Sequence, residues 1–309
     1  MVFMETAVQV EPIKDTTFGA WVRGVDVREL DEDTFTTIYD AWITFGLLIF
    51  PDQFLSKDEQ DTFARRFGEL EFSAAAISNI TSDGMVHSAD DDDLVKSLKG
   101  NQAWHFDSTY MPVQAKGAVF TAEIVPEGGG DTAWTDARAA YDVLDDETKQ
   151  LLEGKHAYHS LYYSMGRSNL LPTLKDDGTY GMYGYHDMDV SLRPLTKVHP
   201  VTGRTNLLLG RHAHNIIGMS ESESTELIDR INAAAAQPPR TYQHQWTEGE
   251  AVLWDNRCIM HRGVPWKMDE PRRMWHTRIA GDPATESAVN HASAELSPQA
   301  EAMKAQLFD

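Results

Sequence analysis

The sequence predicts a mainly β fold with flanking helices. Three observations support this prediction. Short segments rich in valine, isoleucine, leucine and phenylalanine recur along the chain, glycine and proline separate many of them, and only a few amphipathic segments have helical spacing. This patterning is typical of β-sandwiches and barrels, and it does not distinguish one kind of sandwich from another.

The first part of the chain alternates strands and helices. Residues 5–30 predict a small β-ribbon, and residues 31–45 predict a helix because their aromatic and aliphatic side chains recur at helical spacing. Residues 47–50 are an apolar segment that predicts a buried strand. A second helix is expected at 57–67, where Ser56 begins a capping box.

The middle of the chain is less regular. Residues 70–100 carry no clear pattern, whereas residues 117–125 predict a strand. Two short helices are expected at 136–144 and 145–152. Residues 156–195 show little periodicity but contain many aromatic side chains, so we expect them to form an ordered lid.

The C-terminal part returns to strands. Residues 205–209 predict a strand, 223–236 an amphipathic helix, and 250–254 and 272–279 two further strands. From about residue 284 the chain is rich in alanine, serine and glutamate, and we expect a helical or loosely held tail over 284–309. No internal repeat or linker divides the chain, so we expect one catalytic domain over residues 1–309 with a core at about 8–285.

The composition narrows the classes of partner. The formal net charge of −21 repels nucleic acid and anionic membranes, so any anion site must be local and built from arginine. The sequence contains no apolar segment long enough to cross a membrane and no visible signal peptide. The single cysteine, Cys258, fits a reducing compartment, and we expect a cytoplasmic location.

Two separate motifs carry candidate metal ligands. His105 and Asp107 are two residues apart, and in a strand they would project from the same face. His261 follows the segment Trp254-Asp255-Asn256-Arg257 and offers a third ligand. Two imidazoles and one carboxylate on one side of a metal are typical of non-haem Fe(II) oxygenases. The same three residues would also suit a zinc-dependent hydrolase, and a non-catalytic binding protein is a third possibility.

With further motifs, the chain resembles the taurine/2,4-dichlorophenoxyacetate dioxygenase family over roughly residues 8–285. The motifs are Asn101-x-x-Trp104-His105-x-Asp107, Gly129-Gly130-Asp131-Thr132, Trp254-Asp255-Asn256-Arg257-x-x-x-His261 and Arg272. The resemblance implies a double-stranded β-helix, that is, a cupin-like jelly roll with helices outside. It also implies an enzyme that uses Fe(II), 2-oxoglutarate and O₂, and by analogy a homo-oligomer.

The resemblance also implies roles for particular residues. It assigns the iron to His105, Asp107 and His261. It assigns the distal carboxylate of 2-oxoglutarate to Arg272 and Thr132, and an outer or substrate-side role to Asn101. In this family 2-oxoglutarate is converted to succinate and CO₂ while a substrate carbon is hydroxylated. A hydroxylated carbon that bears an oxygen substituent then loses that substituent.

The expected substrate is a small carboxylic acid. Where family members acting on taurine place an arginine, this chain has His276, and several local motifs are more similar to (S)-selective aryloxyalkanoate dioxygenases. Residues 162–190 depart from that subgroup because they contain additional tyrosines, so an aromatic or amino-acid-derived acid is an equal alternative. The candidate substrate contacts are Ser108, Tyr110, Arg211, His212, His276 and Arg278. For Arg278, an ion pair with an acidic residue is the alternative.

Overall fold

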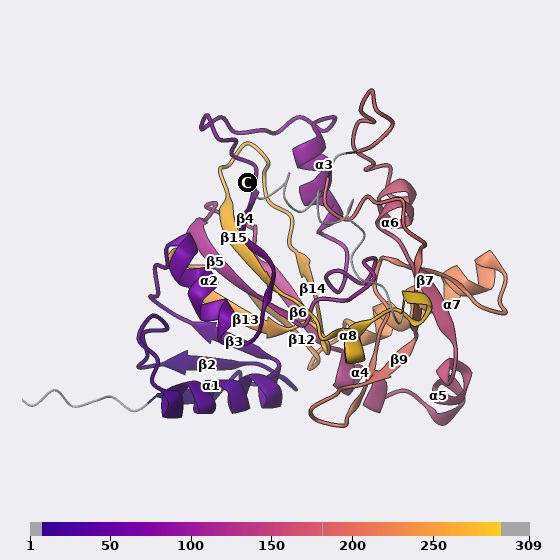
Figure 1. Cartoon of the computed structure of the whole chain (residues 1–309), viewed down its shortest axis with the longest axis horizontal. Helices are drawn as coiled ribbons and strands as arrows, with labels where there is room; N and C mark the ends of the chain where they lie inside the picture. Colours follow the sequence, from indigo (N-terminus) through magenta and orange to yellow (C-terminus); the bar gives the residue numbers. More distant parts are fainter. Residues whose placement is uncertain (1–7, 181, 292–309) are drawn as a thin grey trace, which may run out of the picture.

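The computed structural model describes residues 8–180 and 182–291 and confirms a mainly β jelly roll with helices outside (Figure 1). The strands are β1 (Gln9–Pro12), β2 (Ala20–Arg23), β3 (Leu47–Phe50), β4 (Leu70–Ser78), β5 (Gly117–Ile124), β6 (Thr132–Asp136), β7 (His156–His159), β8 (Ser191–Pro194), β9 (Thr196–Val198), β10 (Thr205–Leu207), β11 (Ala213–Ile216), β12 (Thr241–His244), β13 (Ala251–Asp255), β14 (Ile259–Gly263) and β15 (Arg273–Ile279). The helices are α1 (Glu32–Phe45), α2 (Lys57–Arg65), α3 (Asp93–Gly100), α4 (Ala137–Asp142), α5 (Asp146–Leu152), α6 (Leu161–Arg167), α7 (Glu221–Ala235), α8 (Pro283–Glu286) and the 3₁₀ turn η1 (Val289–His291).

A seven-stranded sheet forms the larger layer, in the order β1-β2-β3-β13-β5-β15-β4. Strands distant in sequence are neighbours here: β13 pairs antiparallel with both β3 and β5, and β15 pairs antiparallel with both β5 and β4. The central strands are apolar on both sides, and every residue of β3 and β13 is buried. Continuous apolar segments are expected of strands covered on both faces.

The two faces of this sheet have different covers. Helices α1 and α2 lie against the outer face, where Trp42 and Phe63 pack with residues of β3 and β13 (Figure 1). The inner face packs against a smaller sheet in the order β12-β6-β14. Trp134 of β6 and Trp254 of β13 meet there, with ring centroids 6.3 Å apart. The metal-ligand motifs stand at one end of the space between the two sheets.

Most predicted elements are confirmed, including the N-terminal ribbon, both early helices with the capping box at Ser56, and the strands at 117–125, 250–254 and 272–279. The weak pattern over 70–100 conceals the edge strand β4 and the helix α3. In β4 the buried positions do not alternate regularly, because its pairing with β15 contains register shifts. These shifts remove the period of two from which a strand is predicted.

The strand predicted at His105 and Asp107 is wrong. His105 makes a single β-bridge with His261, and the chain then enters a turn from Asp107 to Tyr110. The turn includes Ser108, which has a positive φ of 55°. Only half of the residues in Trp104–Thr109 favour strands, namely Trp104, Phe106 and Thr109, and tertiary contacts described below hold the turn.

The region 156–195 is not wholly irregular over its described residues, 156–180 and 182–195. It contains β7, α6 and β8, and β7 lies between β11 and β8 in a separate three-stranded sheet. Each of these elements is short, so none produces a recognisable period in the sequence. Tyr162 of α6 and two tyrosines between α6 and β8, Tyr180 and Tyr185, are in mutual ring contact.

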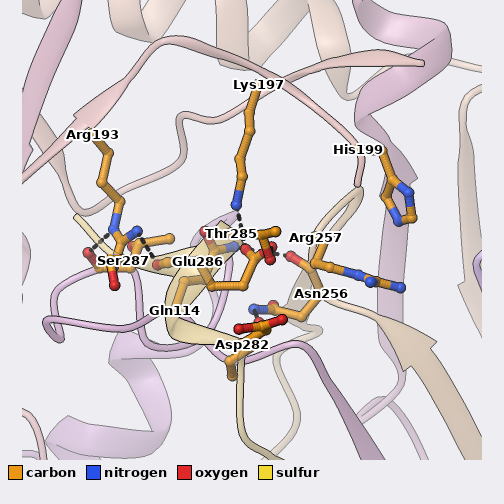
Figure 2. A network of polar contacts seen from close by, with 12 residues as sticks. Gln114, Arg193, Lys197, His199, Asn256, Arg257, Asp282, Thr285, Glu286 and Ser287 are labelled. Carbon is orange, nitrogen blue, oxygen red and sulfur yellow. Dashed lines mark hydrogen bonds and ion pairs between the residues drawn. The ribbon is translucent and has the colours of Figure 1, made fainter. Parts of the chain in front are cut away.

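The start of the predicted tail is held more firmly than expected. Residues 282–291, here called the C-terminal clamp, contain α8 and η1, and Glu286 and Ala288 are buried within it. Figure 2 shows Arg193 and Lys197 converging on Glu286. Residues 292–309 of the predicted tail lie outside the described part of the chain. Within the described ranges, none of the helices combines the length and apolarity that a membrane span requires.

Candidate active site

The two histidines of the metal-ligand motifs are placed by a backbone bridge. The His105 N–H donates to the carbonyl of His261 at 2.9 Å, and the His261 N–H donates to the carbonyl of His105 at 2.8 Å. His261 belongs to β14, where it is paired with Trp134 of β6. The imidazole centroids are 4.3 Å apart. This pair of hydrogen bonds brings two residues that are distant in sequence side by side at the mouth of the β-sandwich.

Asp107 is positioned by a buried asparagine. Its backbone N–H donates to Asn256 Oδ1 at 2.8 Å, and Asn256 Nδ2 donates to the Asp107 carbonyl at 3.0 Å. The same Nδ2 also donates to the carbonyl of Ala115 at 2.9 Å. Asn256 therefore replaces the strand partner that Asp107 lacks, and it explains why a Trp-Asp-Asn sequence accompanies the third ligand.

One ligand atom from each of His105, Asp107 and His261 lies within 4.8 Å of the others. The His105 Nε2–Asp107 Oδ1 distance is 4.0 Å and the His261 Nε2–Asp107 Oδ2 distance is 3.8 Å, which is too long for hydrogen bonds. His105 Nδ1 lies 2.8 Å from the Ala103 carbonyl, so its Nε2 is the nitrogen directed at the cluster. Asp107 Oδ2 is buried with no hydrogen-bond partner among the described residues. These residues fit a divalent cation with open positions.

The charge states of the cluster also suit a cation. Burial lowers the pKa of His105 to about 4, although Asp107 works in the opposite direction, and burial holds the pKa of His261 well below its usual range. Burial opposes ionisation of Asp107, but Arg278 and the neighbouring histidines outweigh it and keep its pKa well below the usual value. At neutral pH the cluster therefore offers two neutral imidazoles and one carboxylate, which are the ligand forms that bind metal.

Arg278 is committed to the cluster. Its Nη2 donates to Asp107 Oδ1 at 2.8 Å, and its Nη1 donates to Ser108 Oγ at 2.9 Å. Ser108 Oγ in turn donates to the carboxylate of Glu71, at 2.8 and 3.0 Å from its two oxygens. With Oδ1 occupied by Arg278, Oδ2 is the oxygen of Asp107 that remains for a metal ion.

Arg272 and Thr132 form a second polar group in the same cavity. Arg272 Nε donates to the Gly130 carbonyl at 2.9 Å, and its guanidinium lies 5.0 Å from the Trp266 ring centroid. Burial lowers its pKa to about 10, so it stays charged at neutral pH. Among the described residues it makes no ion pair within 4 Å. Thr132 Oγ1 accepts a hydrogen bond from Trp246 Nε1 at 3.0 Å, which leaves its proton for another acceptor.

A cavity of about 110 Å³ joins these groups. Ten of the predicted site residues line it, namely Asn101, His105, Asp107, Tyr110, Thr132, His212, His261, Arg272, His276 and Arg278. Two predicted substrate contacts do not line it. Ser108 is fully buried and its hydroxyl is engaged by Arg278 and Glu71, and Arg211 stands behind His212 against Gly100 and Met165.

His212 lines the cavity with a fixed ring. Its Nδ1 lies 2.9 Å from Ser164 Oγ, and its ring is in edge contact with Tyr110 at 4.8 Å between centroids. Arg211 Nη2 reaches the same Ser164 hydroxyl at 3.3 Å. Burial, with the Arg211 charge behind the ring, holds the pKa of His212 well below its usual range. Within the described ranges Arg211 forms no ion pair, and its Nη2 is directed at Ser164 and Met165.

His276 occupies the aromatic wall of the cavity. It stacks on Trp254 with centroids 5.5 Å apart, and its edge contacts involve Phe72 and Phe120. Its Nε2 lies 3.5 Å from Asp107 Oδ2. Its position between three aromatic rings keeps it beside the metal cluster rather than at the outer end of the cavity.

Sequence reasoning missed Glu71, Ser164, Trp246 and the polar role of Asn256. Glu71 is 37 residues from Ser108 in the sequence, and Ser164 is 48 residues from His212. No local spacing connects such pairs. Asn256 is the exception, because it stands inside a motif that already attracted attention.

The comparisons with known proteins agree with this site. The family model described as taurine catabolism dioxygenase TauD, TfdA family, matches residues 9–279. An (S)-phenoxypropionate/alpha-ketoglutarate-dioxygenase from Sphingobium herbicidovorans is 53% identical over 289 residues, covering 93% of this chain and 100% of that protein. An alpha-ketoglutarate-dependent 2,4-dichlorophenoxyacetate dioxygenase from Cupriavidus pinatubonensis is 33% identical, covering 83% of this chain and 92% of the relative.

A solved structure resembles the whole molecule. The crystal structure of AAD-2 in complex with Mn(II) and N-oxalylglycine superposes with a TM-score of 0.82 at 34% identity, covering 91% of this chain and 98% of that one. The fold and the His-Asp-His cluster define a jelly-roll metal-dependent dioxygenase. The chain belongs to the TauD/TfdA family of dioxygenases.

Proposed function

We propose that this dioxygenase uses Fe(II), 2-oxoglutarate and O₂ to hydroxylate an aryloxyalkanoic acid, with cleavage of its ether bond. The observation that carries the proposal is a cavity shared by the open His105, Asp107 and His261 cluster and the Arg272 guanidinium, which has no ion-pair partner among the described residues. A guanidinium fork suits a carboxylate, and Thr132 adds a hydroxyl donor for the same group. A zinc hydrolase would not need this second anion site, and the comparisons give the hydrolase alternative no support.

The distribution of positive charge supports a substrate carboxylate on one side of the cavity. Arg272 serves 2-oxoglutarate, and Arg278 is already held by Asp107 and Ser108. His212 therefore remains as the cavity-lining donor for the substrate carboxylate, with the Arg211 charge behind it. Tyr110 and Leu161 lie nearby and would contact the aryl ring. The name of the relative at 53% identity supports this substrate class and the (S) enantiomer.

The chemistry balances with one molecule of O₂. When bound, iron and 2-oxoglutarate supply the oxidising power, and the residues of the chain bind and orient the reactants. One oxygen atom enters succinate as 2-oxoglutarate loses CO₂. The other is inserted into the C–H bond of the substrate carbon that bears the aryloxy group, so that the hydrogen ends in the new hydroxyl. The resulting hemiketal expels a phenol. From 2-phenoxypropionate the second product is pyruvate.

The test is a turnover assay with Fe(II), 2-oxoglutarate and air. We expect (S)-2-phenoxypropionate to yield phenol, pyruvate and succinate in equal amounts, and the (R) enantiomer to react at least about tenfold more slowly, a difference of about 1.4 kcal/mol in transition-state stabilisation. Replacing Fe(II) with Zn(II) should abolish the reaction. Release of phenol without consumption of 2-oxoglutarate would contradict the proposal and revive a hydrolase.

We further propose that residues 1–309 act as one catalytic domain, that the protein works in the cytoplasm as a homo-oligomer, and that it binds no nucleic acid. The family match over residues 9–279 supports the first point, the single cysteine the second, and the charge of −21 the last. Light scattering would determine the oligomeric state, and a single subunit mass in solution would contradict that part of the proposal.

A further inference from the structure

A continuous series of hydrogen bonds connects the lid to the metal cluster. At the lid end, the Tyr183 hydroxyl donates to Glu71 Oε1, and Glu71 accepts from Ser108 Oγ at 2.8 Å. Ser108 Oγ accepts from Arg278 Nη1 at 2.9 Å, and Arg278 Nη2 donates to Asp107 Oδ1 at 2.8 Å. We call these five residues the lid–ligand relay.

The donors and acceptors of the relay are consistent along its length. Arginine can only donate, so Ser108 Oγ must accept from Arg278 and use its own proton toward Glu71. The Glu71 carboxylate can accept from Ser108 and Tyr183 together. The bonds to Glu71 therefore run from Tyr183 and Ser108, and those from Arg278 run toward Ser108 and Asp107. The Tyr183 and Ser108 hydroxyls also lie 3.4 Å apart, and either could donate in that longer contact. Removal of one member leaves a charged or buried neighbour without its partner.

Aromatic packing holds the relay in place. The Arg278 guanidinium lies 4.6 Å from the Phe72 ring centroid and 5.6 Å from that of Tyr183. The Tyr183 ring is also in edge contact with Phe72 at 5.5 Å. A cation within about 6 Å of an aromatic ring centroid is attracted by that ring. Tyr183 thus contacts Arg278 through its ring and Glu71 through its hydroxyl.

We propose that Tyr183 is a positioning residue, and that docking of the lid through Tyr183 fixes Asp107 for metal binding. Arg278 holds Oδ1 and leaves the unpartnered Oδ2 toward the metal. Through the relay, the position of the lid determines whether Asp107 presents Oδ2 to the metal. Substrate binding under the lid and the arrangement of the metal ligands are then coupled. The inference rests on the proposed function, since that function supplies the metal.

Outer hydrogen bonds of this kind have measurable consequences. Removing a group that orients a metal ligand typically weakens metal binding by about 10- to 100-fold. Ser108 is bonded directly to Arg278, whereas Tyr183 reaches Ser108 through Glu71 and through a weak 3.4 Å contact between the two hydroxyls. We therefore expect Ser108→Ala to weaken Fe(II) binding about tenfold and Tyr183→Phe about threefold to tenfold.

The experiment measures Fe(II) affinity without turnover. Fe(II) is titrated anaerobically into the full-length protein with saturating 2-oxoglutarate and no organic substrate, and the visible absorption of the ternary complex is followed. The variants are Tyr183→Phe, Ser108→Ala and their combination. The matched control is Tyr180→Phe, because Tyr180 lies in the same lid and packs on Tyr162 and Tyr185. Circular dichroism and thermal melting of each protein establish that it is folded.

Two results are expected if the relay exists. Tyr180→Phe binds Fe(II) as the wild type does, whereas Tyr183→Phe binds it more weakly. The combined variant should bind Fe(II) with about the same affinity as the more impaired of the two single variants, because residues in one network do not contribute independently. Coupling is also reciprocal, so Fe(II) with 2-oxoglutarate should slow amide hydrogen exchange over residues 182–187 in the wild type and have less effect in Ser108→Ala.

Contradictory results are equally specific. Wild-type Fe(II) affinity in folded Tyr183→Phe, or energies that simply add in the combined variant, would overturn the relay and leave the proposed function intact. A wild-type protein that binds no Fe(II) at all would overturn the proposed function itself. Equal weakening by Tyr180→Phe would assign the effect to general loosening of the lid and would also overturn the relay.

Discussion

At Thr132, the shape of the side chain and its hydroxyl group can be separated by substitution. The Thr132 hydroxyl accepts from Trp246 Nε1 at 3.0 Å, and Thr132 lines the same cavity as Arg272. Thr132→Val keeps the shape and removes the hydroxyl. A hydrogen bond to a charged group contributes about 1.5–3 kcal/mol, so we expect KM for 2-oxoglutarate to rise at least about tenfold. Steady-state kinetics with varied 2-oxoglutarate would measure this.

The control for Thr132 lies on the same strand. Thr135 of β6 is equally buried and donates to the Ala235 carbonyl at 2.9 Å, away from the cavity. Thr135→Val should destabilise the protein by about 1–3 kcal/mol and leave KM for 2-oxoglutarate unchanged. If both variants change that KM equally, the Thr132 hydroxyl has no special relation to the cosubstrate.

Ser164 is a second residue with a testable position. Its hydroxyl lies 2.9 Å from His212 Nδ1 and 3.3 Å from Arg211 Nη2, so one oxygen orients both groups of the proposed carboxylate site. Ser164→Ala removes about 1–1.5 kcal/mol of hydrogen bonding, and we expect about a five- to tenfold higher KM for the aryloxyalkanoate. KM for 2-oxoglutarate should not change. Ser168→Ala, at the exposed end of α6, is the matched control, and equal effects of the two would contradict the prediction.

At the level of elements, the β-bridge at His105 is approached closely by a glycine from another segment. Gly210, with φ of 91°, approaches so closely that a Cβ would lie 3.2 Å from both His105 Cα and the Trp104 carbonyl. Gly210→Ala adds backbone strain and crowds the first ligand. We expect a loss of stability above about 2 kcal/mol and weaker Fe(II) binding. Urea unfolding and anaerobic metal titration would measure the two effects.

Gly203 provides the comparison that isolates the contact. Its φ of 70° is also positive, but a Cβ there would meet nothing within 4 Å. Gly203→Ala should therefore cost only the backbone strain, about 1–2 kcal/mol, with normal Fe(II) affinity. Similar losses in both variants would show that the approach to His105 has no energetic consequence.

The end of β13 carries a buried ion pair that predicts a pH dependence. Asp255 accepts from Arg257 at 2.8 and 2.6 Å and lies 3.0 Å from His199 Nε2. Burial opposes its ionisation, but Arg257 and His199 outweigh it and hold the pKa of Asp255 below its usual range. A depressed pKa stabilises the fold at pH values above the unfolded value of about 3.9, and this stability is lost as the pH falls further.

The corresponding variant is Asp255→Asn, which leaves the Arg257 charge buried without a partner. At pH 7 we expect a loss of about 3–5 kcal/mol in the free energy of unfolding, and a smaller difference from wild type as the pH falls below about 4. Urea unfolding at both pH values would measure it, with Asp40→Asn on the exposed side of α1 as the control. A difference from wild type that is constant over this pH range would contradict the assignment to Asp255.

These elements also indicate how far sequence reasoning reaches. Helices with a capping box and strands with continuous apolar runs were predictable, because their determinants are local. The pairing of His105, Asp107 and His261 followed from family motifs, although the expected strand was wrong. The strand was wrong because the Asn256 side chain, which comes from a distant segment, binds the Asp107 backbone in place of a strand partner. Glu71 and Ser164 were missed for the same physical reason.

At the level of the whole molecule, the C-terminal clamp joins the base of the lid to the segment that follows Asp107. The Glu286 carbonyl accepts from the Gln114 N–H at 3.0 Å and from Arg193 Nη1 at 2.9 Å (Figure 2). Arg193, in β8, also donates to the carbonyls of Thr109 and Met111 at 2.6 and 2.7 Å. One buried guanidinium therefore connects the lid, the metal-ligand turn and the clamp.

The Glu286 side chain tests whether this junction stabilises the molecule. Its carboxylate is 1% exposed and pairs with Lys197, whose pKa burial lowers against the opposing effect of Glu286. Glu286→Gln leaves that ammonium without a counter-charge, and we expect a loss of about 3–5 kcal/mol in the free energy of unfolding. In the double variant Glu286→Gln, Lys197→Met the unpaired charge is absent, so much of the loss should be recovered. Urea unfolding of both proteins measures this, and a double variant no more stable than Glu286→Gln would mean that the clamp depends on the carboxylate itself rather than on charge balance.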